Sequence, residues 1–125
     1  SKYLIKHLSK YNSFIRFQKE TKNSYHSWFG FCILIKTPNL FNANQIRKYL
    51  EKKGIETRPI IAGNMTKHPA LKYYKYKISD RLTNCDYVME NGFAIPCHQS
   101  LDAESLKYMV SIFEKFFSRL GIDGN

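Results

Sequence analysis

The side chains best suited to chemistry lie in one short segment, GIETRPIIAGNMTKHPAL, residues 54–71. Within it, Arg58 offers a planar fork of donors for phosphate or carboxylate, and Lys67 adds a positive point charge. The carboxamide of Asn64 both donates and accepts hydrogen bonds, and the proline that follows His68 keeps the backbone of this residue extended. These four side chains predict a site for an anionic, hydroxyl-rich ligand.

Each of these residues also has a purely structural interpretation. Arg58 can pair with a nearby carboxylate, either that of Glu56 or that of Glu90. Asn64 can serve only to form a turn, and His68 only to begin a helix at the next proline. The residue types alone leave both interpretations open.

Two further segments contain candidate residues. His98 lies in FAIPCHQSLD, between the end of an expected strand and the start of an expected helix, where functional side chains are common. Trp28 and Phe29 lie in SWFG, where both are also suited to a core. No catalytic triad, phosphate-binding P-loop, dinucleotide glycine motif or metal-ligand cluster is present in the sequence. The chain by itself is therefore not expected to contain a complete active site.

The sequence is basic, with a formal net charge of +10. Most of the lysines are scattered, and the densest patch is KHPALKYYKYK, residues 67–77, which has no acidic residue. Alternating lysines and tyrosines can bind single-stranded nucleic acid, or they can simply coat a surface helix. A nucleic-acid-binding module or a non-catalytic interaction module therefore remains an alternative function.

Size and composition favour one globular domain over residues 1–125. The chain begins at Ser1 with no leader pattern. We therefore expect it to be a piece of a longer protein that is soluble, cytoplasmic and without a membrane partner. Its three cysteines are predicted to be buried free thiols in a reducing compartment.

The spacing of apolar residues predicts eight elements in the order α-β-α-β-α-α-β-α. Asn42 or Asn44, Ser79 and Asp102 are the expected helix caps, and Leu82, Cys85, Val88 and Met89 are expected to face inward. This order predicts an α+β fold, in which helices cover one face of a small, roughly three-stranded sheet and a partner covers the other. The expected helices are 2–18, 42–53, 69–75, 80–90 and 102–119, and the expected strands are 27–36, 55–61 and 92–97.

Three segments together resemble a known enzyme family. SWFGFCILIK, GIETRPIIAGNMTKHPAL and ISDRLTNCDYVMENGFAIPCHQSLDAESLKYMVSIFEKFF are similar, in order and spacing, to the C-terminal part of the DegT/DnrJ/StrS family of pyridoxal-phosphate-dependent sugar aminotransferases. The resemblance covers residues 25–118 and is strongest to the nucleotide-sugar 3-dehydratases of lipopolysaccharide biosynthesis. TRPIIAGN and LTNCDYVMENGF are its most specific parts.

The resemblance implies an architecture that the residues alone did not reveal. Members have the aspartate-aminotransferase fold, form dimers, and bind pyridoxal phosphate or pyridoxamine phosphate in a large domain. A smaller C-terminal domain covers the nucleotide-sugar substrate. The present chain resembles that small domain only, so it is expected to lack the large domain and to be inactive alone. Any iron–sulfur cluster would also belong to the missing part, and no cofactor or metal is expected here.

The resemblance also implies roles for particular side chains. It implies that a substrate-facing loop contains Arg58, Asn64, Lys67 and His68. It also implies that Trp28 and Phe29 lie in a segment that reaches toward the active-site cleft, and that His98 lies near that cleft. Two positions depart from the family pattern: PCHQSL replaces a Tyr-Pro-Gly-Leu run, and His68 stands where glutamine is common. The choice between dehydratase and aminotransferase therefore stays open.

Overall fold

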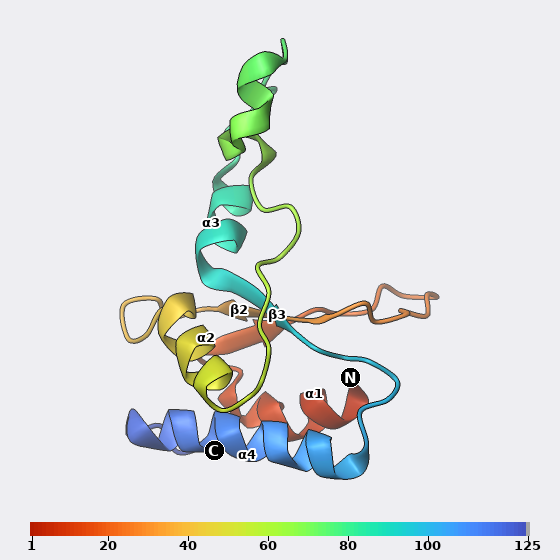
Figure 1. Ribbon diagram of the computed structural model, residues 1–125, viewed down its shortest axis with the longest axis vertical. Helices are drawn as coiled ribbons and strands as arrows, with labels where there is room; N and C mark the ends of the chain where they lie inside the picture. The colour runs from red at the N-terminus through yellow and green to blue at the C-terminus, as the bar shows by residue number, and fades with distance from the viewer. Residues whose placement is uncertain (125) are drawn as a thin grey trace.

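A computed structural model describes residues 1–124. It contains four helices, three strands and three short 3₁₀ segments (Figure 1). The elements are α1 Lys2–Leu8, η1 Ser9–Tyr11, β1 Ile15–Phe17, β2 Phe31–Ile35, α2 Ala43–Lys52, η2 Met65–Lys67, η3 Pro69–Tyr73, α3 Thr83–Asn91, β3 Gly92–Ile95 and α4 Ala103–Arg119.

The three strands form one antiparallel sheet in the order β1-β2-β3. Ile15 is opposite Ile35, and Phe31 is opposite Ile95. Successive side chains of a strand point to opposite faces, so these residues share one face, and all four are buried. The other face of the sheet carries Arg16, Cys32, Leu34 and Ala94.

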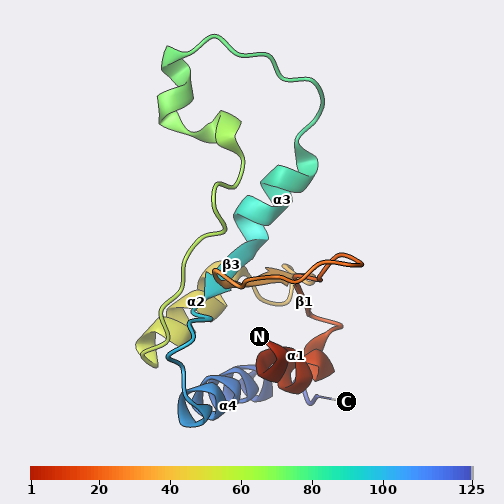
Figure 2. The same ribbon diagram turned by 90° about the vertical axis from the view of Figure 1, so that its right-hand side faces the viewer.

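Helices α1, α2 and α4 lie on the same side of the sheet (Figures 1 and 2). The core between them and the strands is rich in phenylalanine, and Phe117 is fully buried at its centre. Its ring stacks on Tyr11, with 4.0 Å between centroids, and meets Phe41 edge-on at 5.6 Å. The predicted α+β class, with helices covering one face of a three-stranded sheet, is confirmed.

Helix ends follow the capping signals in the sequence. Asn42 and Gln45 form a capping box at the start of α2, and Gly54 follows its end with φ +77°. The carboxylate of Asp102 accepts a hydrogen bond from the backbone N–H of Ser105, at 2.7 Å, and starts α4. These local signals fix the two helices that flank the core.

Residues 59–91, which we call the arm, project from the face of the sheet opposite α1 and α4 (Figures 1 and 2). We call residues 58–68 the polar loop; η2 lies within it, and the arm contains this loop from Pro59 onward, followed by η3 and α3. Only two of its residues, Asn64 and Asn91, are buried. Because the arm buries almost no apolar side chain, it is held by polar contacts and not by a core of its own.

The N-terminal helix is shorter than predicted. Over residues 2–18, helix α1 ends at Leu8, η1 continues to Tyr11, and Ile15–Phe17 forms β1. The backbone N–H of Phe14 bonds the carbonyl of Tyr11 at 2.9 Å and turns the chain. The spacing of Ile15 from Leu8 and Tyr11 suits a helix, and its spacing from Phe17 suits a strand. Spacing alone therefore could not decide between helix and strand here.

The strand predicted over residues 55–61 does not form. Only a single bridge joins Arg58 to Ala94, and Pro59 has no N–H with which to extend a ladder. The strand predicted over residues 27–36 is confined to β2, and the one over 92–97 to β3.

The predicted helices of the arm are also altered. The helix predicted over 69–75 is the 3₁₀ segment η3, and the one over 80–90 begins at Thr83 with Leu82, not Ser79, in the N-cap position. The side chains expected to face inward are not buried, because α3 lies beyond the sheet from the core; they are Leu82, Cys85, Val88 and Met89.

The cysteines are unpaired, as predicted, but they are not deeply buried. Cys32 and Cys97 are half-buried and Cys85 is exposed on α3, where nothing in residues 1–124 covers it. Partial burial raises the pKa of the Cys32 thiol.

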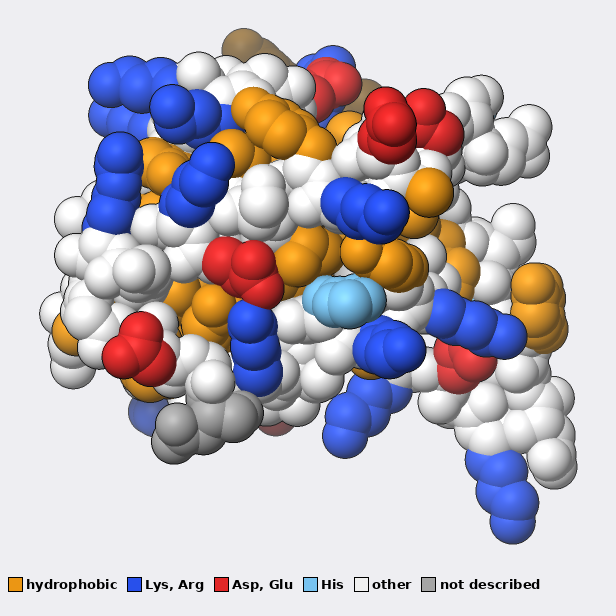
Figure 3. Space-filling view, turned by 90° about the horizontal axis from the view of Figure 1, so that it is seen from below, with side chains coloured by type: hydrophobic (Ala, Val, Ile, Leu, Met, Phe, Trp, Pro, Cys, Tyr) orange, Lys and Arg blue, Asp and Glu red, His pale blue; other side chains and the backbone are white. Residues whose placement is uncertain are grey.

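Across residues 1–124 we find no helix with the length and apolar character that crossing a bilayer requires. Seen from the side of α1 and α4 (Figure 3), lysine and arginine side chains are spread over the surface, with aspartate and glutamate among them. This face therefore lacks the continuous basic patch that is typical of a nucleic-acid-binding surface.

Candidate functional site

The backbone of Arg58 is fixed beside the sheet. Its N–H donates to the carbonyl of Ala94 at 2.9 Å, and the N–H of Ala94 donates to the carbonyl of Arg58 at 2.7 Å. The side chain is 76% exposed, and its guanidinium pairs with Glu56. An exposed ion pair of this kind is weak, so the guanidinium is available to exchange Glu56 for a more strongly charged anion.

A cavity of about 890 Å³ lies between the polar loop and the uncovered face of the sheet. Cys32 and Ala94 contribute the sheet side, and Arg58 and His68 contribute the loop side. The rest of the lining is mostly apolar, including Phe29, Pro59, Ile60, Ile61, Ala62 and Pro96. An apolar pocket with a few polar groups at its edge is the usual form of a small-molecule site.

His68 closes the loop on itself. Its ring Nε2 lies 2.7 Å from the carbonyl oxygen of Ala62. A carbonyl oxygen only accepts hydrogen bonds, so Nε2 carries a proton and donates it. His68 therefore contributes both to the shape of the loop and to the lining of the cavity.

Asn64 and Lys67 turn away from the cavity toward α3. The carboxamide of Asn64 is 3% exposed and donates from Nδ2 to Oδ1 of Asp86 at 2.6 Å. The ammonium of Lys67 lies 2.8 Å from the same carboxylate oxygen and 3.7 Å from Glu90. The hydrogen bond from Lys67 lowers the pKa of Asp86, and the same bond raises the pKa of Lys67.

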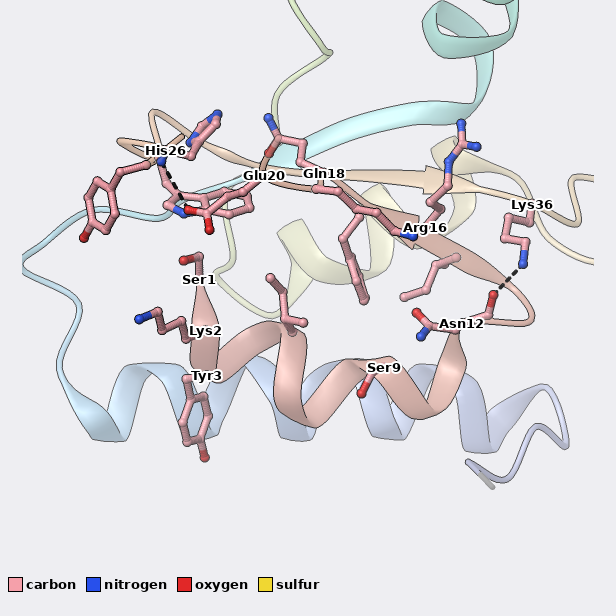
Figure 4. A pocket seen from close by; sticks show the side chains of 16 residues that line it. Ser1, Lys2, Tyr3, Ser9, Asn12, Arg16, Gln18, Glu20, His26 and Lys36 are labelled. Atoms are coloured by element: carbon pink, nitrogen blue, oxygen red, sulfur yellow. Dashed lines mark hydrogen bonds between the residues drawn. The ribbon is translucent and has the colours of Figure 1, made fainter. Parts of the chain in front are cut away.

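Trp28 lies at a second cavity, of about 790 Å³, between α1, β1 and the loop that follows β1. Figure 4 shows its polar rim, where the backbone N–H of His26 bonds Glu20 and Lys36 bonds the carbonyl of Asn12. The indole packs against the ring of Phe31, with 5.8 Å between centroids. Trp28 thus joins the core to this second cavity and does not line the one beside the polar loop.

Phe29 and His98 have different surroundings. Phe29 lines the cavity beside the polar loop with its ring 91% exposed. His98 accepts a hydrogen bond at Nδ1 from the backbone N–H of Ser100, at 3.1 Å, and does not line either cavity described above. The structure therefore brings Arg58, His68 and Phe29 together and leaves His98 apart.

The described residues do not fit a covalently held pyridoxal phosphate. Its aldehyde reacts with a lysine whose pKa is lowered by burial or by a neighbouring cation. Every lysine here is exposed, and the pKa of Lys67 is raised. Nor do residues 1–124 gather three or more histidine, cysteine or acidic side chains that could hold a metal ion.

Sequence reasoning missed Gln18 and Asp86. The side chain of Gln18 lines both cavities, and its Oε1 accepts from the backbone N–H of Cys32 at 3.0 Å. Asp86 was detectable in principle, because Asp86 and Glu90 lie four residues apart on one helix face and so form an acidic pair for a lysine-bearing loop.

The sequence is similar to those of bacterial sugar enzymes. Over 115 residues it is 36% identical to the lipopolysaccharide biosynthesis protein RfbH of Salmonella typhimurium, a match that covers 92% of this chain and 26% of RfbH. Over 113 residues it is 33% identical to the GDP-4-keto-6-deoxy-D-mannose 3-dehydratase of Yersinia pseudotuberculosis, covering 90% of this chain and 28% of the dehydratase. The chain spans about a quarter of the length of these relatives.

A solved structure has the same fold. The GDP-4-keto-6-deoxy-D-mannose-3-dehydratase of Escherichia coli, with hydrated pyridoxal phosphate bound, superposes with a TM-score of 0.78 at 29% identity. The superposition covers 89% of this chain and 28% of that enzyme. The resemblance found in the loop and helix motifs is thus confirmed. Because the DegT/DnrJ/EryC1/StrS aminotransferase family matches residues 1–114, nearly the whole length, the chain belongs to that family.

Proposed function

We propose that this chain is the substrate-covering C-terminal domain of a pyridoxal-phosphate-dependent nucleotide-sugar enzyme. The full-length protein would be a 4-keto-6-deoxyhexose 3-dehydratase or an aminotransferase that makes sugars for lipopolysaccharide. The named activities of its relatives support this reaction class. One observation carries the proposal: Arg58 and His68 of the polar loop and Phe29 of a second segment line one cavity on the sheet face opposite α1, α2 and α4.

The chemistry of the cavity suits a nucleotide-sugar. Arg58 can form paired hydrogen bonds with a phosphate oxygen, and the diphosphate would then replace the carboxylate of Glu56. Phe29 and the apolar lining would exclude water from the sugar once a second surface closes the open side. Asn64 and Lys67 serve the same site by shaping the loop, since their polar atoms contact α3.

The proposal includes partners that lie outside this chain. The large domain of the same enzyme would bind the cofactor and face the uncovered side of the sheet, and two full-length copies would form a homodimer in the cytoplasm. Phe29, Ile61 and Tyr73 are strongly exposed on that side and along the arm. Exposed apolar side chains of this size commonly mark surfaces that another protein surface covers.

Replacing Arg58 in the full-length enzyme tests the proposed site. Loss of a charge-assisted hydrogen bond corresponds to about 1.5–3 kcal/mol, so Arg58→Ala should raise KM for the nucleotide-sugar by about 10- to 100-fold. Arg58→Lys should fall between this variant and the wild type, because it keeps the charge but loses the fork.

Arg81→Ala is the matched control, because Arg81 is also an exposed arginine but does not line the cavity. Its KM should equal that of the wild type. An unchanged KM in Arg58→Ala would contradict the assignment of the cavity.

A further inference from the structure

The polar loop is anchored by one side chain. Asn64 is the only buried residue between positions 58 and 82. Its Oδ1 accepts from the backbone N–H of Thr66 at 3.0 Å and from the Thr66 hydroxyl at 2.7 Å. Its Nδ2 donates to Asp86 at 2.6 Å. This carboxamide therefore makes three hydrogen bonds within the protein. Losing them would leave a buried amide without partners, which destabilises the folded state.

One oxygen of Asp86 joins two residues of that loop. Oδ1 accepts from Nδ2 of Asn64 and lies 2.8 Å from Nζ of Lys67. Glu90, one helical turn further along α3, lies 3.7 Å from the same ammonium. Because the acceptor is charged, each of these contacts is stronger than a hydrogen bond between neutral groups.

The backbone of the loop also lies close against α3. Gly63 has φ +65°, a conformation that side-chain-bearing residues rarely adopt. A Cβ atom at this position would lie 3.0 Å from Cγ of Met89. Asp86, Met89 and Glu90 occupy one face of the helix at three- and four-residue spacing, so the loop docks along a single face of α3.

We propose that Asp86 is a positioning residue that holds the polar loop against α3, so that Ala62 and His68 face the cavity. We call the contacts of Asp86 with Asn64 and Lys67 the latch. The effect of Asp86 on substrate use rests on the function proposed above, whereas its effect on the position of the loop does not. Ala62 and His68, which flank the latched residues, form the loop's cavity wall through their hydrogen bond of 2.7 Å.

Amide hydrogen exchange in the full-length protein tests the latch directly. Asp86→Ala should speed exchange of the hydrogen-bonded backbone amides of residues 66–68 by about tenfold or more, because local opening no longer breaks the bonds to Asp86. Asp86→Asn should have a smaller effect, since its amide oxygen can still accept from Asn64 but carries no charge for Lys67. Glu114→Gln is the control: it breaks an exposed ion pair with Lys10 far from the arm and should leave these amides unchanged.

Steady-state kinetics test the positioning role. Asp86→Ala should raise KM for the nucleotide-sugar several-fold with a smaller change in kcat, because it disorders binding groups and touches no reacting atom. Adding Lys67→Ala to Asp86→Ala should produce little further change, because both substitutions break the same latch.

The outcomes separate the two proposals. Unchanged exchange at residues 66–68 in a folded Asp86→Ala protein would overturn the latch, whatever the activity. Faster exchange with an unchanged KM would overturn the positioning role. A full-length protein that turns over no nucleotide-sugar would refute the proposed function, and the exchange rates would still decide whether Asp86 holds the loop.

Discussion

The polar loop divides its side chains between two tasks. Arg58 and His68 line the cavity, whereas Asn64 and Lys67 contact α3. The sequence predicted the four residues as one group, because their types suit a single anionic ligand. It could not predict the division, which is decided by Asp86, 22 residues beyond Asn64 along the chain.

His68 allows a test at the scale of one side chain. His68→Ala removes the hydrogen bond to Ala62, and a net loss of about 0.5–1.5 kcal/mol should raise KM for the nucleotide-sugar in the full-length enzyme by about 2- to 10-fold. His68→Gln should remain near the wild-type value, since its carboxamide supplies a donor of similar reach. Equal KM values for the two variants would show that the hydrogen bond to Ala62 does not contribute.

At the scale of elements, prediction succeeded where local signals and burial agreed. Helices α2 and α4 begin and end at their capping residues, and both bury an apolar stripe in the core. Prediction failed where the local sequence signals and the burial of the side chains disagreed. Ile15 fits helical and strand periods equally, and the apolar residues of α3 lie beyond the sheet, where no second layer in residues 1–124 covers them.

The N-cap of α4 should make the stability of the chain depend on pH. The hydrogen bond from the backbone N–H of Ser105 lowers the pKa of Asp102 below its usual value. A folded-state pKa below the unfolded value, about 3.9, stabilises the fold above that pH. The stabilisation is lost as pH falls through the folded-state pKa.

Urea unfolding of the wild type, Asp102→Ala and Asp102→Asn at a series of pH values would measure this contribution. Asp102→Ala should be less stable than the wild type at pH 7, and the difference should shrink below about pH 4. Asp102→Asn caps equally well without a titrating group, so this part of the acid dependence should be absent. A gap between the wild type and Asp102→Ala that stays constant down to pH 2 would contradict the assignment.

At the scale of the whole molecule, the chain has a well-packed side and an open side. Helices α1, α2 and α4 bury one face of the sheet, and the arm stands on the other (Figure 2). The tyrosines of the arm are exposed. A chain that spans about a quarter of its relatives' length, yet places its candidate site on the open side, suits a domain that closes over a substrate held elsewhere. The net charge of +10 would help attract an anionic nucleotide-sugar.

The sharpest test of whether this cavity binds the substrate is a structure of the full-length enzyme with its nucleotide-sugar bound. In that structure the guanidinium of Arg58 should lie about 3 Å from a diphosphate oxygen, with Glu56 displaced and the large domain closing the cavity beside Phe29. A bound nucleotide-sugar whose phosphates contact neither Arg58 nor any other residue of this cavity would contradict it.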